Sequence, residues 1–187
     1  MAHYLDIQLR PDPEISPCHL LAALYAKLHR ALARLGSDRI GVSFPGQCES
    51  AYRLGDRLRL FGPMDDLAQL MVLDWLSGIR DHVNLGKAAP VPPNALYRTL
   101  HRVQAKSSPD RLRRRQMKRH GLTEAQAYEQ LPDGVEERLH LPFVQLTSAS
   151  TGQTFRLFLR LSEPQPIEVD GLFNAYGLST SATIPWF

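Results

Sequence analysis

Residues 3–36 decide the fold, and they read HYLDIQLRPDPEISPCHLLAALYAKLHRALARLG. The first seven of these residues alternate between polar and apolar side chains, which indicates a strand with one buried face. Ser16 and Pro17 are residue types that begin helices, and Gly36 is the type that ends them. Between them, leucines recur every three or four residues: Leu21, Leu24, Leu28, Leu32 and Leu35. This pattern predicts one strand followed by a long amphipathic helix that packs against it.

Apolar residues continue in regular patterns up to about residue 104. Alternating side chains predict strands over 40–44 and 57–61, and a second helix fits residues 65–77. A fourth strand fits residues 95–104. The resulting order, β-α-β-β-α-β, is typical of the ferredoxin-like split βαβ arrangement.

The run AAPVPP at residues 88–93 indicates a boundary, because such proline-rich runs mark loops and linkers. We therefore expect a ferredoxin-like domain over residues 1–94 and a second region over residues 95–187. The elements predicted later in the chain are two helices and three strands: helices over 109–120 and 123–131, and strands over 143–148, 155–160 and 171–176. The fold class expected is α+β.

Length and composition exclude several classes of protein. A chain of 187 residues buries a core without disulfides or a structural metal. Cys18 and Cys48 lie 30 residues apart, which is not the spacing of a zinc site or a disulfide framework. The first residues lack the apolar segment of a secretory signal, and no apolar stretch approaches the roughly 18 residues of a membrane helix. We expect a cytoplasmic protein that contacts no membrane.

Positive charge is concentrated in one segment. The formal net charge is +3, but residues 98–119 hold nine Lys and Arg side chains against Asp110, a local charge of +8. The helix predicted over 109–120 has few apolar residues with which to bind a core. Five of its seven basic residues, His120 included in the count, lie on or beside one face: Arg111, Arg114, Arg115, Lys118 and Arg119. Like charges at this spacing repel, so we expect the phosphates of a double-stranded nucleic acid along that face.

Arg102 and Gln104 point to the same side of the extended segment before this helix. Arginine binds guanine and glutamine binds adenine through two hydrogen bonds each, so the pair suits the reading of bases. The alternative is an exposed strand edge with ordinary polar residues.

Four further residues are ordinary when taken singly. His29 lies at the edge of the leucine stripe, Ser148 and Ser150 lie in the predicted hairpin turn, and Tyr176 lies near a predicted strand end. Packing and turn formation account for each of them. Together they offer a base and hydroxyl groups without the motifs of a metal or nucleotide site. An enzyme built on them needs no cofactor and no metal.

Three motifs together resemble a known family. They are SPDRLRRR at 108–115, SASTGQTFRLF at 148–158, and the ending that begins YGLS at 176–179 and finishes PWF at 185–187. They resemble the CRISPR repeat-processing endoribonucleases of type I-F systems, and the resemblance runs from Tyr4 to Phe187.

The resemblance implies a metal-independent endoribonuclease with an RNA-recognition region after residue 94. Such enzymes cut precursor CRISPR RNA at the 3′ base of each repeat stem-loop by attack of a 2′-hydroxyl group. The products carry a 2′,3′-cyclic phosphate and a 5′-hydroxyl. The enzyme then stays bound to the hairpin and remains with the other subunits of the surveillance complex.

The resemblance also implies residue roles at the reaction centre. His29 matches the base that acts on the 2′-hydroxyl, Ser148 matches the serine that orients the ribose, and Tyr176 matches a tyrosine that holds the histidine. Arg102 and Gln104 match the residues that read bases at the foot of the stem.

The remaining residues expected to bind RNA lie in the helix and the hairpin. Phe155 matches an aromatic residue that stacks on the terminal base pair. The others are Arg111, Arg114, Arg115, Lys118, Arg119 and Ser150. Two positions depart from the family pattern: Lys118 replaces an expected arginine and loses its two-pronged hydrogen bonding, and Ala149 replaces an expected glutamine.

Two non-catalytic alternatives remain open from the sequence. The helices over 109–120 and 123–131 fit a helix-turn-helix DNA-binding regulator, although the basic residues crowd the first helix and not the second. The chain also fits an RNA-binding subunit that has lost cleavage.

Overall fold

The computed structural model describes residues 1–48, 52–104, 109–131, 139–148 and 151–187. The fold class is α+β, as expected. The chain forms two compact units, one of Met1–Arg102 with Leu141–Phe187 and one of Val103–His140. This division differs from the boundary expected at residue 94. The reason is that strands from residues 141–187 pair with strands before residue 103 and so return the chain to the first unit.

The first unit contains the sheet predicted from the N-terminal half. Its strands are β1 (His3–Leu9), β2 (Gly41–Ser43), β3 (Arg57–Gly62) and β4 (Val83–Leu85), in the antiparallel order β2-β3-β1-β4. The short β5 (Ala89–Pro90) also pairs with β1. Residues 95–104 do form strands, β6 (Leu96–Arg98) and β7 (Leu100–Val103), but their expected place as the fourth strand of this sheet was wrong: β4, which completes it, comes earlier in the chain.

Residues 95–104 contribute to two other sheets instead. β6 (Leu96–Arg98) pairs with β10 (Ile184–Trp186) near the C-terminus. β7 (Leu100–Val103) joins a sheet of order β7-β9-β8, made with β8 (Phe143–Thr147) and β9 (Thr154–Leu161). β8 and β9 form the expected hairpin.

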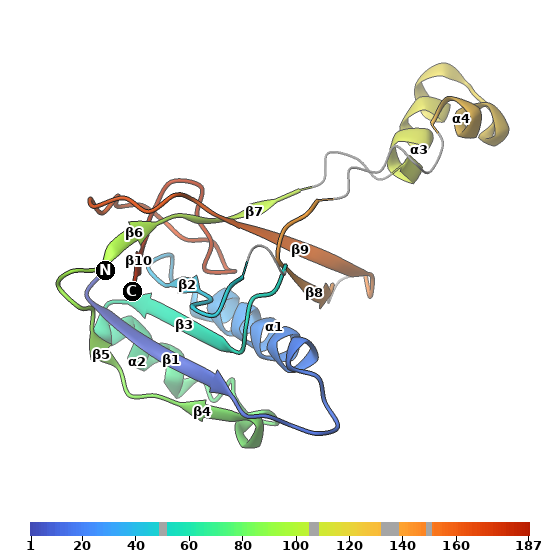
Figure 1. Cartoon of the computed structure of the whole chain (residues 1–187). Coiled ribbons are helices and arrows are strands. Elements are labelled where there is room, and N and C mark those ends of the chain that lie inside the picture. The colour runs from blue at the N-terminus through green and yellow to red at the C-terminus, as the bar shows by residue number, and fades with distance from the viewer. Residues whose placement is uncertain (49–51, 105–108, 132–138, 149–150) are drawn as a thin grey trace. The chain divides into compact units, whose positions relative to one another are not determined.

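Two helices lie on one face of the large sheet (Figure 1). α1 (Pro17–Leu35) begins at the predicted cap, where the Ser16 hydroxyl accepts a hydrogen bond from the His19 amide, and it ends at Gly36 with a φ of 70°. α2 (Met64–Val72) ends five residues earlier than predicted. Asp74 there adopts a positive φ, which ends the helix, and a single turn η1 (Arg80–His82) follows.

The other face of the sheet is covered by the end of the chain. Asp6 of β1 pairs with Arg59 of β3, whose guanidinium is nearly buried and lies 4.1 Å from the ring centre of Phe187 and 4.7 Å from that of Tyr4. The Arg59 guanidinium also donates to the Phe187 carbonyl. Burial of an arginine requires such partners, so the C-terminal residue is bound to the centre of the sheet.

The second unit is a pair of helices that agrees with the sequence prediction. α3 spans Pro109–His120 and α4 spans Glu124–Gln130, with Thr123 and Gln126 forming the expected capping box. The side of α3 that faces α4 carries half-buried residues, and the Arg113 guanidinium lies 4.5 Å from the Tyr128 ring centre. Within the described ranges, no helix is long and apolar enough to cross a membrane.

Candidate active site and RNA interface

A pocket of about 290 Å³ brings together four of the residues singled out in the sequence. It lies between α1, the β8–β9 hairpin and the segment near Tyr176, all within the first unit. The four are His29, Ser148, Phe155 and Tyr176. Among the described residues that line it, none is acidic and the one further charged residue is Arg30.

The imidazole of His29 is held from two directions. Its Nδ1 lies 2.9 Å from the Ala175 carbonyl oxygen, and its ring stacks on the Tyr176 ring with centroids 3.7 Å apart and planes 3° apart. A carbonyl only accepts hydrogen bonds, so Nδ1 carries the proton and donates it. The neutral imidazole therefore has its lone pair on Nε2, the nitrogen that can act as a base.

The Ala175 carbonyl belongs to a tight turn, not to the strand expected over residues 171–176. The Asn174 side chain accepts hydrogen bonds from the amides of Tyr176 and Leu178, and the Asn174 amide donates to the Leu178 carbonyl. These local bonds use the polar groups that strand pairing would need. The strand prediction was wrong because an asparagine in this position favours a turn.

Gly177 fixes this turn against the large sheet. Its φ is 68°, its carbonyl accepts from the Val42 amide, and an added Cβ would lie 2.5 Å from a Val42 methyl carbon. Only glycine fits both the backbone angle and the close approach. The turn is thereby attached to β2.

Tyr25 attaches the same turn to α1. Its hydroxyl donates to the Tyr176 carbonyl over 2.7 Å, and its side chain is fully buried. Burial, with a smaller contribution from Tyr176, raises the pKa of Tyr25, so the hydroxyl remains a donor. Because Tyr25 lies one helical turn before His29, α1 holds both the imidazole and the loop that orients it.

Ser148 lies at the end of the hairpin strand, across the pocket from α1. Its amide donates to the Gln153 carbonyl, and its hydroxyl accepts from the Thr151 amide over 3.3 Å. The structure thus brings Ser148 to the same pocket as His29. Ser150 and Ala149 lie outside the described residues.

The residues expected to read bases are divided between the two units. Arg102 is exposed on β7, with its guanidinium 5.8 Å from the ring centre of Phe155. Phe155 is half-buried and lines the pocket, so Arg102 and the pocket belong to one surface. Gln104 is exposed and belongs to the second unit.

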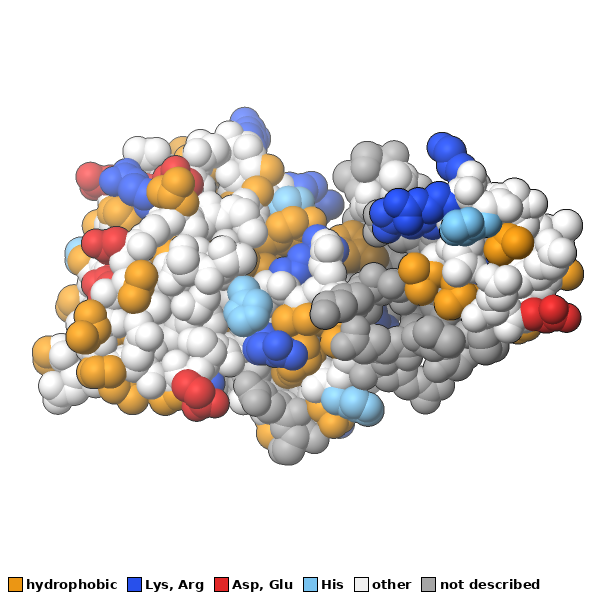
Figure 2. All heavy atoms as spheres, turned by 90° about the horizontal axis from the view of Figure 1, so that it is seen from above, with side chains coloured by type: hydrophobic (Ala, Val, Ile, Leu, Met, Phe, Trp, Pro, Cys, Tyr) orange, Lys and Arg blue, Asp and Glu red, His pale blue; other side chains and the backbone are white. Residues whose placement is uncertain are grey.

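The basic face of α3 is exposed, as the spacing predicted. The exposed residues are Arg114, Arg115, Lys118 and Arg119, whereas Leu112, Arg113, Gln116 and Met117 are half-buried. Lys and Arg side chains are visible on the surface of this unit at the right of Figure 2. Arg111 lies in α3, but its side chain is outside the described residues. The helix therefore has one face that packs against α4 and another that is basic and exposed.

No group of three or more His, Cys, Asp or Glu side chains that could hold a metal ion occurs in the described parts of the chain. Cys18 and Cys48 are both free.

Comparison with known proteins identifies the family. Residues 4–187 match the family described as "CRISPR-associated protein (Cas_Csy4)". The chain belongs to the Csy4 family. Two relatives are named "CRISPR-associated endonuclease Cas6/Csy4": one from Pseudomonas aeruginosa (strain UCBPP-PA14) is 54% identical and one from Escherichia coli (strain UTI89 / UPEC) is 46% identical. Both alignments cover 100% of this chain and of the relative. The suspected resemblance is thus confirmed.

Three residues in or behind the pocket of this Csy4-family chain were not singled out as functional from the sequence. Arg30 lines the pocket, whereas Tyr25 and Ala175 lie behind it and hold Tyr176 and His29. Tyr25 falls on the buried face of α1 and had the pattern of a core residue. The Ala175 carbonyl is a backbone group, which every residue has, so the residue type at position 175 does not indicate it. Arg30 is adjacent to His29 in sequence, and its position beside a candidate base was the available signal.

Proposed function

We propose that the chain is a metal-independent endoribonuclease that cuts precursor CRISPR RNA at the 3′ base of a repeat stem-loop. The observation that carries the proposal is the hydrogen bond from His29 Nδ1 to the Ala175 carbonyl. It leaves Nε2 as the basic nitrogen of a histidine that lines a pocket with a serine and two aromatic rings. The names of the relatives support endonuclease activity.

The proposed reaction needs a base and an aligned nucleophile. His29 Nε2 takes the proton of the 2′-hydroxyl, whose oxygen attacks the adjacent phosphorus, and the bond from phosphorus to the 5′-oxygen breaks. The departing 5′-oxygen takes a proton from water and becomes a hydroxyl, the protonated His29 returns its proton to water, and the other fragment keeps a 2′,3′-cyclic phosphate. Ser148 orients the ribose, and Tyr176 keeps the imidazole in place through the ring stack.

Recognition of the hairpin is assigned to two surfaces. The exposed arginines and lysine of α3 bind phosphates along the RNA duplex, because the deep, narrow major groove of A-form RNA hides its bases. Arg102 and Gln104 read the bases at the foot of the stem, and Phe155 stacks on the last base pair. Arg111 and Ser150 complete the proposed contacts.

After cleavage, the phosphate contacts remain, so the hairpin product stays bound. This accounts for a role as a subunit of a CRISPR surveillance complex in the cytoplasm. The order β-α-β-β-α-β and the antiparallel sheet order support assignment of the N-terminal half to the ferredoxin-like fold.

A cleavage assay tests the proposal. The protein is incubated in excess EDTA with a repeat hairpin RNA, and with the same RNA carrying one 2′-deoxy nucleotide before the scissile phosphate. We expect cleavage of the first RNA, equal binding of both, and no cleavage of the second. Loss of activity in EDTA, or cleavage of the deoxy RNA, contradicts the mechanism. Binding without any cleavage of the first RNA indicates a non-catalytic subunit.

A further inference from the structure

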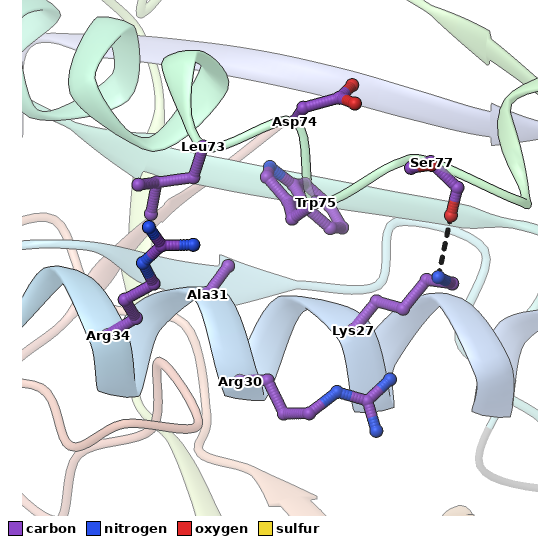
Figure 3. Close-up of a pocket in the computed structure, with 8 residues that line it drawn as sticks. All are labelled: Lys27, Arg30, Ala31, Arg34, Leu73, Asp74, Trp75 and Ser77. Atoms are coloured by element: carbon purple, nitrogen blue, oxygen red, sulfur yellow. Dashed lines mark hydrogen bonds between the residues drawn. The ribbon is translucent and has the colours of Figure 1, made fainter.

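A second pocket, of about 230 Å³, lies on α1 beside the candidate active site (Figure 3). Arg30 lines both pockets, so the two are neighbours at this residue. The floor of the second pocket is apolar and includes Ala31 and the buried Trp75. Figure 3 shows Lys27 and Arg34 on either side of this floor, with Arg30 along the outer side of the helix.

The charge on α1 is entirely positive. Residues 17–35 contain Lys27, Arg30 and Arg34 and no aspartate or glutamate. The three side chains lie at positions i, i+3 and i+7, so they share one side of the helix. Like charges at this spacing are destabilising unless an anion lies between them.

The described part of the chain does not pair these charges with acidic groups. Within the described residues, Arg30 and Arg34 form no ion pair, and Lys27 donates to a neutral group, the Ser77 carbonyl. The acid in the pocket wall, Asp74, is paired with Arg80 at 2.5 Å. The cationic row is therefore available to an external anion.

The row of Lys27, Arg30 and Arg34 is long enough to bind a nucleic-acid strand that leaves the candidate active-site pocket. Lys27 and Arg34 lie seven positions apart on the helix, a rise of about 10 Å, which is long enough for the row to contact more than one phosphate of a strand. The row passes Arg30, which adjoins His29 in the active-site pocket. An RNA strand whose scissile phosphate lies at His29 therefore meets Arg30 first and the second pocket next.

We propose that Lys27, Arg30 and Arg34 bind the phosphates of the single-stranded RNA that continues 3′ of the cleavage site. This proposal rests on the proposed function, since it takes the scissile phosphate to lie at His29. A protein subunit with an acidic surface is the competing occupant of the same row. RNA is favoured because Arg30, the middle residue of the row, also lines the candidate active-site pocket that the RNA enters in the proposed function.

The test compares two RNAs and two variants. One RNA is a hairpin that ends at the cleavage site. The other carries a short 3′ tail and a single 2′-deoxy nucleotide that blocks cleavage. Binding is measured by fluorescence anisotropy across a series of salt concentrations, for the natural chain, for Arg34→Ala and for Arg10→Ala. Arg10 is an exposed arginine that lines neither pocket and serves as the matched control.

We expect the natural chain to bind the tailed RNA more tightly than the trimmed one. Arg34→Ala should weaken binding of the tailed RNA about fivefold at 0.1 M salt and reduce its salt slope by about 0.7, the value for one single-strand phosphate contact. It should not affect the trimmed RNA, and Arg10→Ala should affect neither.

Each other outcome counts against the proposal. An equal loss on both RNAs places Arg34 on the hairpin, and no loss on either removes RNA from this row. If Arg34→Ala instead weakens assembly with other subunits while both RNAs bind normally, the occupant is a protein. Cleavage of the all-RNA tailed substrate is measured in parallel. Absence of cleavage contradicts the proposed function. Normal cleavage, together with equal binding of the tailed and trimmed RNAs, contradicts only the proposal that Lys27, Arg30 and Arg34 bind the 3′ strand.

Discussion

The ring of Tyr176 lies flat on the imidazole of His29, with centroids 3.7 Å apart and an angle of 3° between the planes. The residue before Tyr176 supplies the carbonyl that accepts the Nδ1 proton. One turn of backbone therefore sets both the tilt of the imidazole and the nitrogen that carries its proton. We therefore expect Tyr176 to act as a positioning residue, mainly through its ring.

Substitution of Tyr176 separates the two parts of its side chain. Tyr176→Phe keeps the stacked ring, so single-turnover cleavage should stay within about twofold of the natural rate. Tyr176→Leu removes the flat surface and frees the imidazole to rotate, which should lower the rate by up to about 10²-fold, the effect of a misplacement of about 1 Å. RNA affinity measured beside the rate serves as the control. An equal loss in both variants would instead assign the hydroxyl a part in the reaction.

Tyr25→Phe removes the hydrogen bond that joins α1 to the turn. The Tyr176 carbonyl would lose a buried donor, so the free energy of unfolding should fall by about 1–3 kcal/mol. The cleavage rate should also fall, since the Ala175 carbonyl loses its support. Urea unfolding and single-turnover kinetics measure the two effects. Unchanged kinetics with a lower stability would mean that the turn holds its shape without Tyr25.

The same residue makes stability depend on alkaline pH. Burial raises the pKa of Tyr25 above its ordinary value in the folded state, whereas an unfolded tyrosine titrates near pH 10. The unfolded chain therefore releases the proton first, and stability is lost as the pH rises above about 10. Tyr25→Phe should flatten the fall of the unfolding midpoint between about pH 9 and 11. A fall of the same steepness in the variant would assign it to other groups.

The sequence predicted elements whose ends carry local signals. α1 has its serine cap and terminal glycine, and α3 and α4 have a proline start, a glycine stop and a capping box. Each of these signals acts within a few residues, so periodicity and caps suffice to locate them. The basic face of α3 was predictable for the same reason.

The sequence could not determine which strands pair. The segment 83–85 is only three residues long, too short for alternation to mark a strand, yet it completes the large sheet. Residues 95–104 pair with the distant segments 154–161 and 184–186. Pairing between segments so far apart depends on the whole chain. The orientation of His29 could not be predicted for a similar reason, because the imidazole is held by a backbone carbonyl 146 residues away.

The α3 face should dominate the salt dependence of RNA binding. Replacing Arg115 and Arg119 together with alanine should reduce the slope of log K against log[salt] by roughly 1–2 units, at about 0.7–0.9 per phosphate contact. The matched control is Arg113→Ala on the opposite side of α3, whose guanidinium lies over Tyr128. We expect the control to disturb the packing of α4 and to change the slope less. An unchanged slope in the double variant would remove this face from the interface.

Arg102 should act on specificity, because it is exposed on β7 beside Phe155 at the edge of the active-site pocket. If its guanidinium binds guanine through two hydrogen bonds, Arg102→Ala should cost about 1–3 kcal/mol on the cognate stem. The cost should be much smaller on a stem whose terminal guanine pair is reversed, since that stem lacks the contact in the natural protein as well. The measurement is the equilibrium affinity of the natural protein and of Arg102→Ala for each of the two stems, which together give the cost of the substitution on each stem. Phe155→Ala provides the matched comparison: loss of stacking should cost about 1–3 kcal/mol on either stem, because every base has a face on which to stack. Equal losses on both stems for Arg102→Ala would mean that Arg102 binds a phosphate and reads no base.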